Sequence, residues 1–154
     1  MKKLMIVLVL AGLGFMGVGQ NVVNNRTIYN LDQFVNDCLK ELGVDSVMIN
    51  IQNVNGLVYG KYPAVCYKAG DTFMIGISNT LFYGASLNAI AHELVHVKQI
   101  SKGELRVLGS DNIEFNSIAY LVSTDSHFND PQEVEARKIG EKLYNQFRPN
   151  YIRY

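Results

Sequence analysis

The fold of this chain is decided by one stretch, Leu87-Asn88-Ala89-Ile90-Ala91-His92-Glu93-Leu94-Val95-His96-Val97-Lys98-Gln99-Ile100. Its apolar residues recur with helical spacing on more than one side, so the stretch predicts a helix that is buried in the core. Within it stands an HExxH sequence, residues 92–96. Two residues four apart lie on one face of a helix, so the imidazoles of His92 and His96 can converge on a single metal ion.

Each residue type in this pentapeptide suits metal chemistry. Imidazole nitrogen is a good ligand for Zn²⁺. Glu93 stands beside the two histidines, where its carboxylate can take a proton from a water molecule activated by the metal. The alternative is a core helix that carries two hydrogen-bonded histidines. We favour a zinc site with His92 and His96 as ligands and Glu93 as the catalytic base.

The first third of the chain predicts another helix and a hairpin. Apolar residues at i, i+3 and i+4 indicate an amphipathic helix over 31–42, which Gly43 ends. Alternating residues then favour a strand over 47–52. The Asn-Gly pair at 55–56 is typical of a hairpin turn, from which 57–59 would return.

Two strands are expected before the central helix, at 64–67 and 72–78, with Gly70 and Asp71 between them. The central helix is expected over 87–100, and a glycine three residues later is suited to end it.

After the central helix we expect a second hairpin, at 105–108 and 113–115. A last helix over 131–147 begins with Asp130 as N-cap and Pro131 in the first position. Helices and antiparallel strands thus occupy separate parts of the chain. This order predicts an α+β domain, in which a small antiparallel or mixed sheet packs on the central helix and the C-terminal helix.

The central helix resembles a known family. Its segment Ala91-His92-Glu93-Leu94-Val95-His96-Val97-Lys98-Gln99 is similar to the active-site helix of zincin metallopeptidases, and within them to small gluzincin-like domains. The metzincin branch is excluded, because it has Gly at the position of Gln99 and His at that of Lys102. The resemblance implies a minimal zincin-like fold, a bound Zn²⁺ and hydrolysis of peptide bonds. It also implies that the strand at 73–77 is the sheet edge along which a peptide lies.

In gluzincin-like domains a downstream Glu completes the metal site. The candidates here are Glu114, His127, Glu133 and Glu135. In the resembling families the ligand often stands three residues before an Ala, as Glu133 does before Ala136, whereas thermolysin-like enzymes place Ala directly after it, which fits Glu135. Glu133 projects about 60° from the middle of the helix's core side and Glu135 about 100°. We favour Glu133, with Glu135 and His127 as alternatives.

Two further features remain open to two interpretations. Glu133 also fits a capping box with Asp130, in which its side chain would bind a backbone N–H. Tyr67, Tyr83 and Tyr120 are candidate hydrogen-bond donors to an oxyanion beside the metal, or simply packed rings.

The first 19 residues predict a secretory signal peptide. Two lysines follow Met1, and the uncharged run over 4–18 is shorter than the about 20 residues that span a bilayer. Small glycines precede a cleavage site before Gln20. We therefore expect residues 20–154 to form a secreted or periplasmic domain with no membrane partner in the mature form. The alternative is an uncleaved anchor.

The composition fits one globular domain. The chain has 154 residues, of which 48% are hydrophobic, and 14 Lys+Arg balance 14 Asp+Glu. Because there is no basic surplus, a nucleic-acid partner is not expected. Cys38 and Cys66 would form a disulfide in an oxidising compartment, or serve as small buried hydrophobes.

The sequence therefore predicts an exported zinc-dependent peptidase with a peptide or protein substrate. In this prediction His92, His96 and Glu133 hold the metal, and water takes the fourth position. The alternative is a non-catalytic zincin-like binding module with a structural metal. Such a site is closed by four protein ligands, and His127 is the natural fourth.

Overall fold

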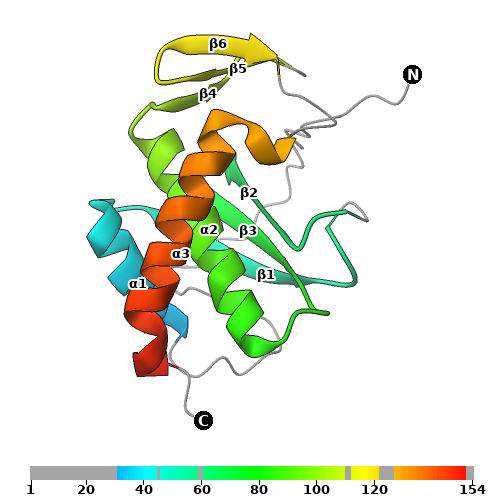
Figure 1. Cartoon of the computed structure of the whole chain (residues 1–154), viewed down its shortest axis with the longest axis vertical. Helices are drawn as coiled ribbons and strands as arrows, with labels where there is room; N and C mark the ends of the chain where they lie inside the picture. The colour runs from blue at the N-terminus through cyan, green and yellow to red at the C-terminus, as the bar shows by residue number, and fades with distance from the viewer. Residues whose placement is uncertain (1–30, 45, 59–60, 110–111, 122–126, 152–154) are drawn as a thin grey trace.

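A computed structural model describes residues 31–44, 46–58, 61–109, 112–121 and 127–151. These residues form an α+β structure with three α-helices, one short 3₁₀ helix and two three-stranded sheets (Figure 1). The coarse fold class predicted from the sequence is therefore confirmed. The signal peptide predicted at 1–19 lies outside the described residues.

The first sheet is mixed and has the strand order β1-β3-β2. Strand β1 (Met48–Val54) runs parallel to β3 (Thr72–Ser78), and β2 (Ala64–Ala69) pairs antiparallel to β3. Gly70, with φ +59°, and Asp71 form the turn between β2 and β3. One face of the sheet is apolar and buried. Its side chains are those of Ile49, Ile51, Phe73, Ile75 and Ile77.

Two predictions about this sheet are wrong. The strand at 73–77 is not an edge, because β3 lies in the centre and pairs on both sides. The Asn-Gly pair does not close a hairpin on β1, whose partner is the parallel β3. Instead, the N–H of Gly56 donates to the side chain of Asn79 (3.1 Å). Val58 then pairs with Tyr62 in an isolated bridge.

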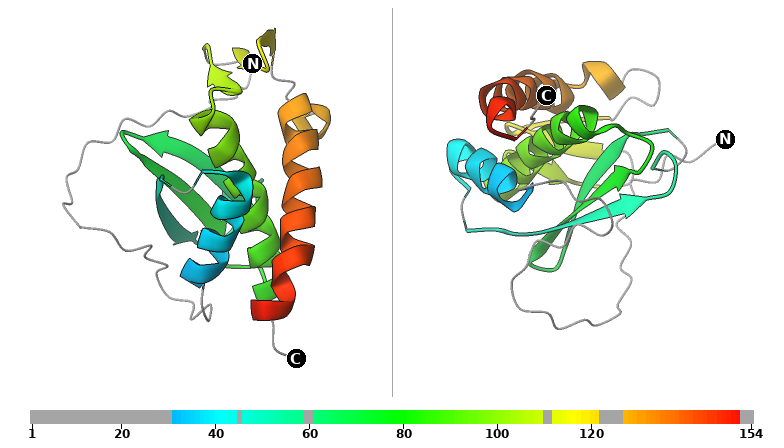
Figure 2. Two further views of the ribbon diagram at one scale, coloured as in Figure 1. Left: turned by 90° about the vertical axis from the view of Figure 1, so that its left-hand side faces the viewer. Right: turned by 90° about the horizontal axis from the view of Figure 1, so that it is seen from below.

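The three α-helices lie on one side of this sheet (Figure 2). Helix α2 (Tyr83–Ser101) packs against β2 and β3, and also contacts both α1 (Leu31–Leu42) and α3 (Pro131–Tyr151). It is therefore buried nearly all round, as predicted. The predicted bounds of α1 are confirmed: Gly43 has φ +67°, and the N–H of Val44 donates to the Leu39 carbonyl (3.0 Å) in a Schellman motif.

Helices α2 and α3 are longer than expected, each by about one turn. Helix α2 begins at Tyr83, whose hydroxyl donates to the carbonyl of Tyr151 (2.9 Å). Helix α3 continues through Pro149 to Tyr151, whose ring packs edge-on against Phe34 and whose hydroxyl donates to Asp37 (2.5 Å). These contacts between distant segments hold both extra turns, so local pattern did not predict them.

The second sheet stands at the end of α2 and beside the start of α3 (Figure 1). It is antiparallel, with the order β4 (Leu105–Val107), β5 (Asn112–Phe115) and β6 (Ile118–Leu121). The predicted hairpin is β4–β5, and β6 was not predicted. Asn116 and Ser117 adopt positive φ between β5 and β6 without the glycine that usually marks such a turn.

Cys38 and Cys66 are free thiols, so the disulfide alternative is wrong for this structure. Cys38 belongs to the apolar core, and Cys66 packs against the same core. Cys38 lies on α1, where burial and then Asp37 and Glu41 raise its pKa to about 12. Cys66 lies on β2, where burial and then the charge of Glu93 raise the pKa of its thiol.

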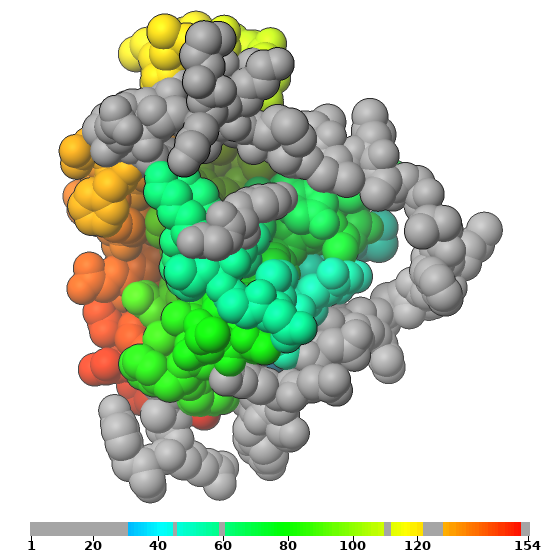
Figure 3. Space-filling view, turned by 90° about the vertical axis from the view of Figure 1, so that its right-hand side faces the viewer, coloured from blue at the N-terminus to red at the C-terminus, as the bar shows by residue number. Residues whose placement is uncertain are grey.

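Within the described ranges, none of the helices has the length and apolar character to cross a bilayer. Figure 3 shows the side of the molecule on which the first sheet lies, with its strands at the surface beside the orange part of α3.

Candidate metal centre

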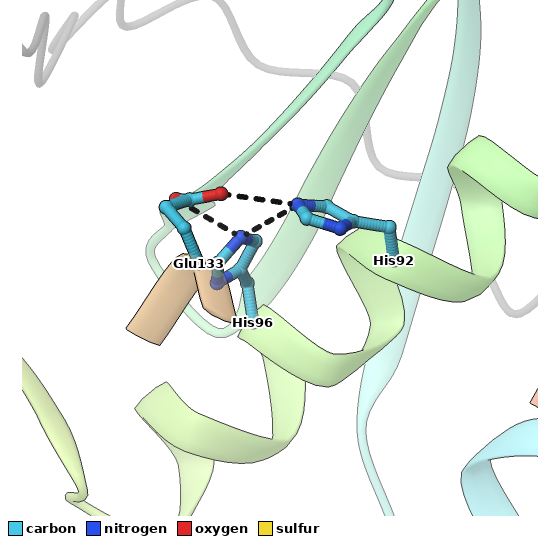
Figure 4. Close-up of side chains that lie close together, drawn as sticks. All are labelled: His92, His96 and Glu133. Carbon is cyan, nitrogen blue, oxygen red and sulfur yellow. Dashed lines mark hydrogen bonds and ion pairs between the residues drawn. The ribbon is translucent and has the colours of Figure 1, made fainter. Parts of the chain in front are cut away.

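The two histidines of the HExxH sequence point to the same side of α2 (Figure 4). Their ring centroids are 4.9 Å apart, and their Nε2 atoms are 3.2 Å apart. Glu133, from the first turn of α3, faces both rings. Its Oε2 lies 3.2 Å from Nε2 of His92, and its Oε1 lies 3.4 Å from Nε2 of His96. One ligand atom from each of these three residues lies within 4.8 Å of the other two, and the three residues are called the triangle below.

The size of this triangle can be compared with a zinc site. Zinc binds imidazole nitrogen and carboxylate oxygen at about 2.0–2.2 Å in a tetrahedron, which places neighbouring ligand atoms about 3.3–3.5 Å apart. The two histidine nitrogens, 3.2 Å apart, are close to that spacing, and each of them has a different oxygen of the Glu133 carboxylate at 3.2 or 3.4 Å. Two histidines and one carboxylate are also a donor set that zinc accepts. The residues present therefore fit Zn²⁺.

The position of Glu133 follows from the way α3 starts. The carbonyl of Asp130 accepts the backbone N–H of Glu133 (2.9 Å) and of Val134 (3.0 Å), which closes the first turn. Helix α3 then runs beside α2, and Gly140 lies against the backbone of His92. This close approach directs the Glu133 carboxylate at the imidazoles.

His96 sits in a strongly negative environment. Its burial lowers the pKa of the imidazole, but the hydrogen bond to Glu133, the charges of Glu93 and Glu133, and the contact with Gln99 raise it. The net result is a pKa of about 9. Without a metal, the ring is therefore protonated near neutral pH, and the surrounding carboxylates favour a cation at this position.

A fully buried amide holds the other side of the His96 ring. Oε1 of Gln99 lies 2.8 Å from Nδ1 of His96. Nε2 of Gln99 donates to the carbonyl of Gln132 (3.1 Å) and to Oε2 of Glu135 (2.8 Å). Gln99 was not among the functional residues predicted from the sequence. The available signal was a glutamine three residues after His96, on the same side of the helix.

Glu135 is not part of the triangle. One of its oxygens accepts from Gln99, and the other lies 3.7 Å from Nζ of Lys98. Lys98 in turn pairs with Glu104 at 2.6 Å. The side chain of Glu135 is 30% exposed and bridges two residues of α2.

Glu93 is buried, with 6% of its surface exposed. Its charge raises both the pKa of His96 and that of the Cys66 thiol. Its role as a base stays a prediction.

The remaining ligand candidates have other positions. Glu114 lies on β5 and pairs with Arg106 at 3.5 Å. The backbone of His127 begins the 3₁₀ helix η1 (His127–Asn129), and its side chain lies outside the described part of the chain.

The tyrosine candidates are also distributed over the fold. Tyr83 binds the carbonyl of Tyr151, at the opposite end of α2 from His96. Tyr120 donates to Oε1 of Gln132, and burial together with Asp130 raises its pKa to about 12. Tyr67 lies on β2. An oxyanion contact for any of them stays a prediction.

Comparison of the chain with known proteins returns no match, whether with family models, curated proteins or solved structures. A function is therefore inferred from the sequence and from the geometry of the site.

Proposed function

We propose that this protein is a zinc-dependent peptidase with a minimal zincin-like fold. The observation that carries the proposal is the triangle of His92, His96 and Glu133, in which two imidazole nitrogens 3.2 Å apart face the two oxygens of one carboxylate. This is a donor set that zinc accepts. Three protein ligands are the number found in catalytic zinc sites, where a fourth position is left for water or substrate.

The residues of the chain would divide the chemistry between them. A bound zinc ion supplies Lewis acidity, which lowers the pKa of water and polarises a carbonyl group. Glu93 follows His92 on the same helix and is buried near His96, so it is placed to accept a proton from the attacking water. It then returns that proton to the amine nitrogen as the peptide C–N bond breaks. His92, His96 and Glu133 would hold the zinc ion.

The position of β2 supports a peptide as the substrate. Among the described strands β2 pairs with β3 only, and it packs beside α2, which carries the triangle. An extended peptide can bind along such an edge through main-chain hydrogen bonds, with little demand on its sequence. We also propose that the protein is exported, on the strength of the signal-peptide pattern at 1–19.

The decisive experiment combines zinc stoichiometry with peptide cleavage, on the wild type and on Glu93→Gln. We expect one zinc per chain in both proteins, because Glu93 is not a ligand, and hydrolysis in the wild type alone. Glu141→Gln is a matched control, because this exposed carboxylate lies on α3, away from its first turn.

Two outcomes would contradict the proposal in different ways. Cleavage by Glu93→Gln at the wild-type rate would exclude the proposed base. Zinc bound tightly in a closed site of four protein ligands, without hydrolysis, would favour the structural-metal module instead.

A further inference from the structure

We infer that Gln99 is a positioning residue, which fixes the nitrogen that His96 presents to the metal, and that Glu135 in turn fixes the orientation of Gln99. This inference rests on the proposed zinc site and assigns roles to two residues outside its ligand triangle. It depends on the direction of each hydrogen bond around the Gln99 amide.

The partners of Gln99 determine which way its amide points. One side of the amide faces the carbonyl oxygen of Gln132 at 3.1 Å and Oε2 of Glu135 at 2.8 Å. Both of those atoms only accept hydrogen bonds, so this side must be the NH₂ group, which has two hydrogens to donate. The opposite orientation would set the amide oxygen against two other oxygens. The side facing His96 is therefore the amide oxygen.

The amide oxygen then determines the state of the His96 ring. An oxygen 2.8 Å from Nδ1 can only accept, so Nδ1 must carry its hydrogen. The other nitrogen, Nε2, is the atom that faces Glu133 and His92. A zinc ion would take the place of a proton at Nε2, while the hydrogen bond at Nδ1 stays intact.

The contact is shielded from competing water. Gln99 has no exposed surface, and His96 is 9% exposed. All three hydrogen-bonding positions of the Gln99 amide that the structure uses are directed to α2 or α3. The ring of His96 consequently cannot rotate or change tautomer without breaking a buried hydrogen bond.

Charged residues near the surface contact Glu135 in turn. Its second oxygen lies 3.7 Å from Lys98, which pairs with Glu104 just before β4. Glu135 therefore contacts α2 through both of its oxygens. Metal-binding histidines in proteins commonly depend on such outer partners, whose loss weakens metal affinity by about 10- to 100-fold.

The test measures zinc affinity by competition with a chelator, on the full chain. Gln99→Leu has a similar size and removes every hydrogen bond of the amide. We expect its zinc affinity to fall by about 10- to 100-fold. Glu135→Gln keeps an acceptor but loses the charge beside Lys98, so we expect a fall of a few fold. Glu141→Gln, an exposed carboxylate on the same helix, should bind zinc like the wild type.

A spectroscopic measurement separates positioning from simple packing. The chain has three histidines, so ¹⁵N spectra of the zinc-loaded protein are simple to assign. In the wild type we expect His96 to bind through Nε2 and to keep a slowly exchanging hydrogen on Nδ1. In Gln99→Leu that hydrogen should exchange faster, and in Glu135→Gln the change should be smaller.

The outcomes distinguish this inference from the proposed function. If Gln99→Leu binds zinc as tightly as the wild type and keeps the protected Nδ1 hydrogen, Gln99 only packs and the inference is wrong, although the zinc site stands. If the wild type binds no zinc, the site and the role of Gln99 are both wrong. Should Gln99→Leu fail to fold, the partly exposed Glu135→Gln carries the test, and unchanged affinity and exchange there would overturn the inference.

Discussion

A Cβ atom at Gly140 would lie 2.9 Å from the Cα of His92 and 3.0 Å from its backbone nitrogen. Helices α3 and α2 therefore meet backbone to backbone at this point. Glu133 stands two helical turns before Gly140, so the same approach that brings the backbones together sets its carboxylate against the imidazoles. Helix packing and the ligand triangle are thus linked through one glycine.

Gly140→Ala should destabilise the protein and weaken zinc binding together. The added methyl group meets backbone atoms, which cannot move aside like a flexible side chain, and overpacking of this kind costs about 1–3 kcal/mol. The better helix propensity of Ala returns at most about 1 kcal/mol. Urea unfolding and a zinc titration measure both effects. Lys138→Ala, an exposed change two residues earlier, is the control. A more stable Gly140→Ala protein with unchanged zinc affinity would contradict this account.

Glu133→Gln should reduce zinc affinity by more than about 100-fold. An amide oxygen is a poor substitute for a carboxylate ligand, and the loss should exceed that caused by changing an outer partner. The first turn of α3 is closed by backbone hydrogen bonds of Glu133 and Val134 to the Asp130 carbonyl, which the variant keeps, so this turn should stay intact. The matched comparison is Glu135→Gln, which changes the other carboxylate in this part of the helix. Equal losses in the two variants in a zinc competition assay would show that Glu133 has no special role.

The hydroxyl of Tyr151 should make stability sensitive to alkaline pH. Burial and the hydrogen bond to Asp37 raise the pKa of Tyr151 above its unfolded value of about 10. This contribution is complete below pH 10 and is lost at higher pH, because the unfolded state then releases the proton more readily. Tyr151→Phe should cost about 1 kcal/mol at neutral pH and lose stability less steeply above pH 10. Chemical unfolding between pH 8 and 11 tests this, with Tyr144→Phe as the control; equal slopes in Tyr151→Phe and the wild type would contradict it.

Local pattern predicted those parts of the fold that local interactions determine. The bounds of α1 follow from apolar spacing and from Gly43, and the end of α2 from Gly103, which has φ +69°. The strand order could not be predicted in the same way. Whether β3 is central depends on its pairing with β1, more than 20 residues away, and no turn sequence encodes that contact.

In the candidate site, too, local spacing predicted one part, and contacts between distant residues determine the rest. The spacing of His92 and His96 alone predicts that the two rings share a helix face, and they do. The part played by Gln99 could not be derived in that way, because an amide fits either a core or a surface until its partners are known. Those partners, Gln132 and Glu135, lie on another helix, 33 and 36 residues further along the chain.

Zinc should stabilise the folded protein through the same triangle. At a free concentration 100 times the dissociation constant, a ligand that binds only the folded state adds about 2.7 kcal/mol to the free energy of unfolding. The gain should disappear in His92→Ala and His96→Ala, because each variant removes one corner of the triangle. His127→Ala decides the last alternative for the ligand set: if Glu133 completes the site, this variant keeps the full gain in a thermal unfolding experiment with and without zinc. A loss of the gain in His127→Ala, together with its retention in Glu133→Gln, would move the third ligand to His127.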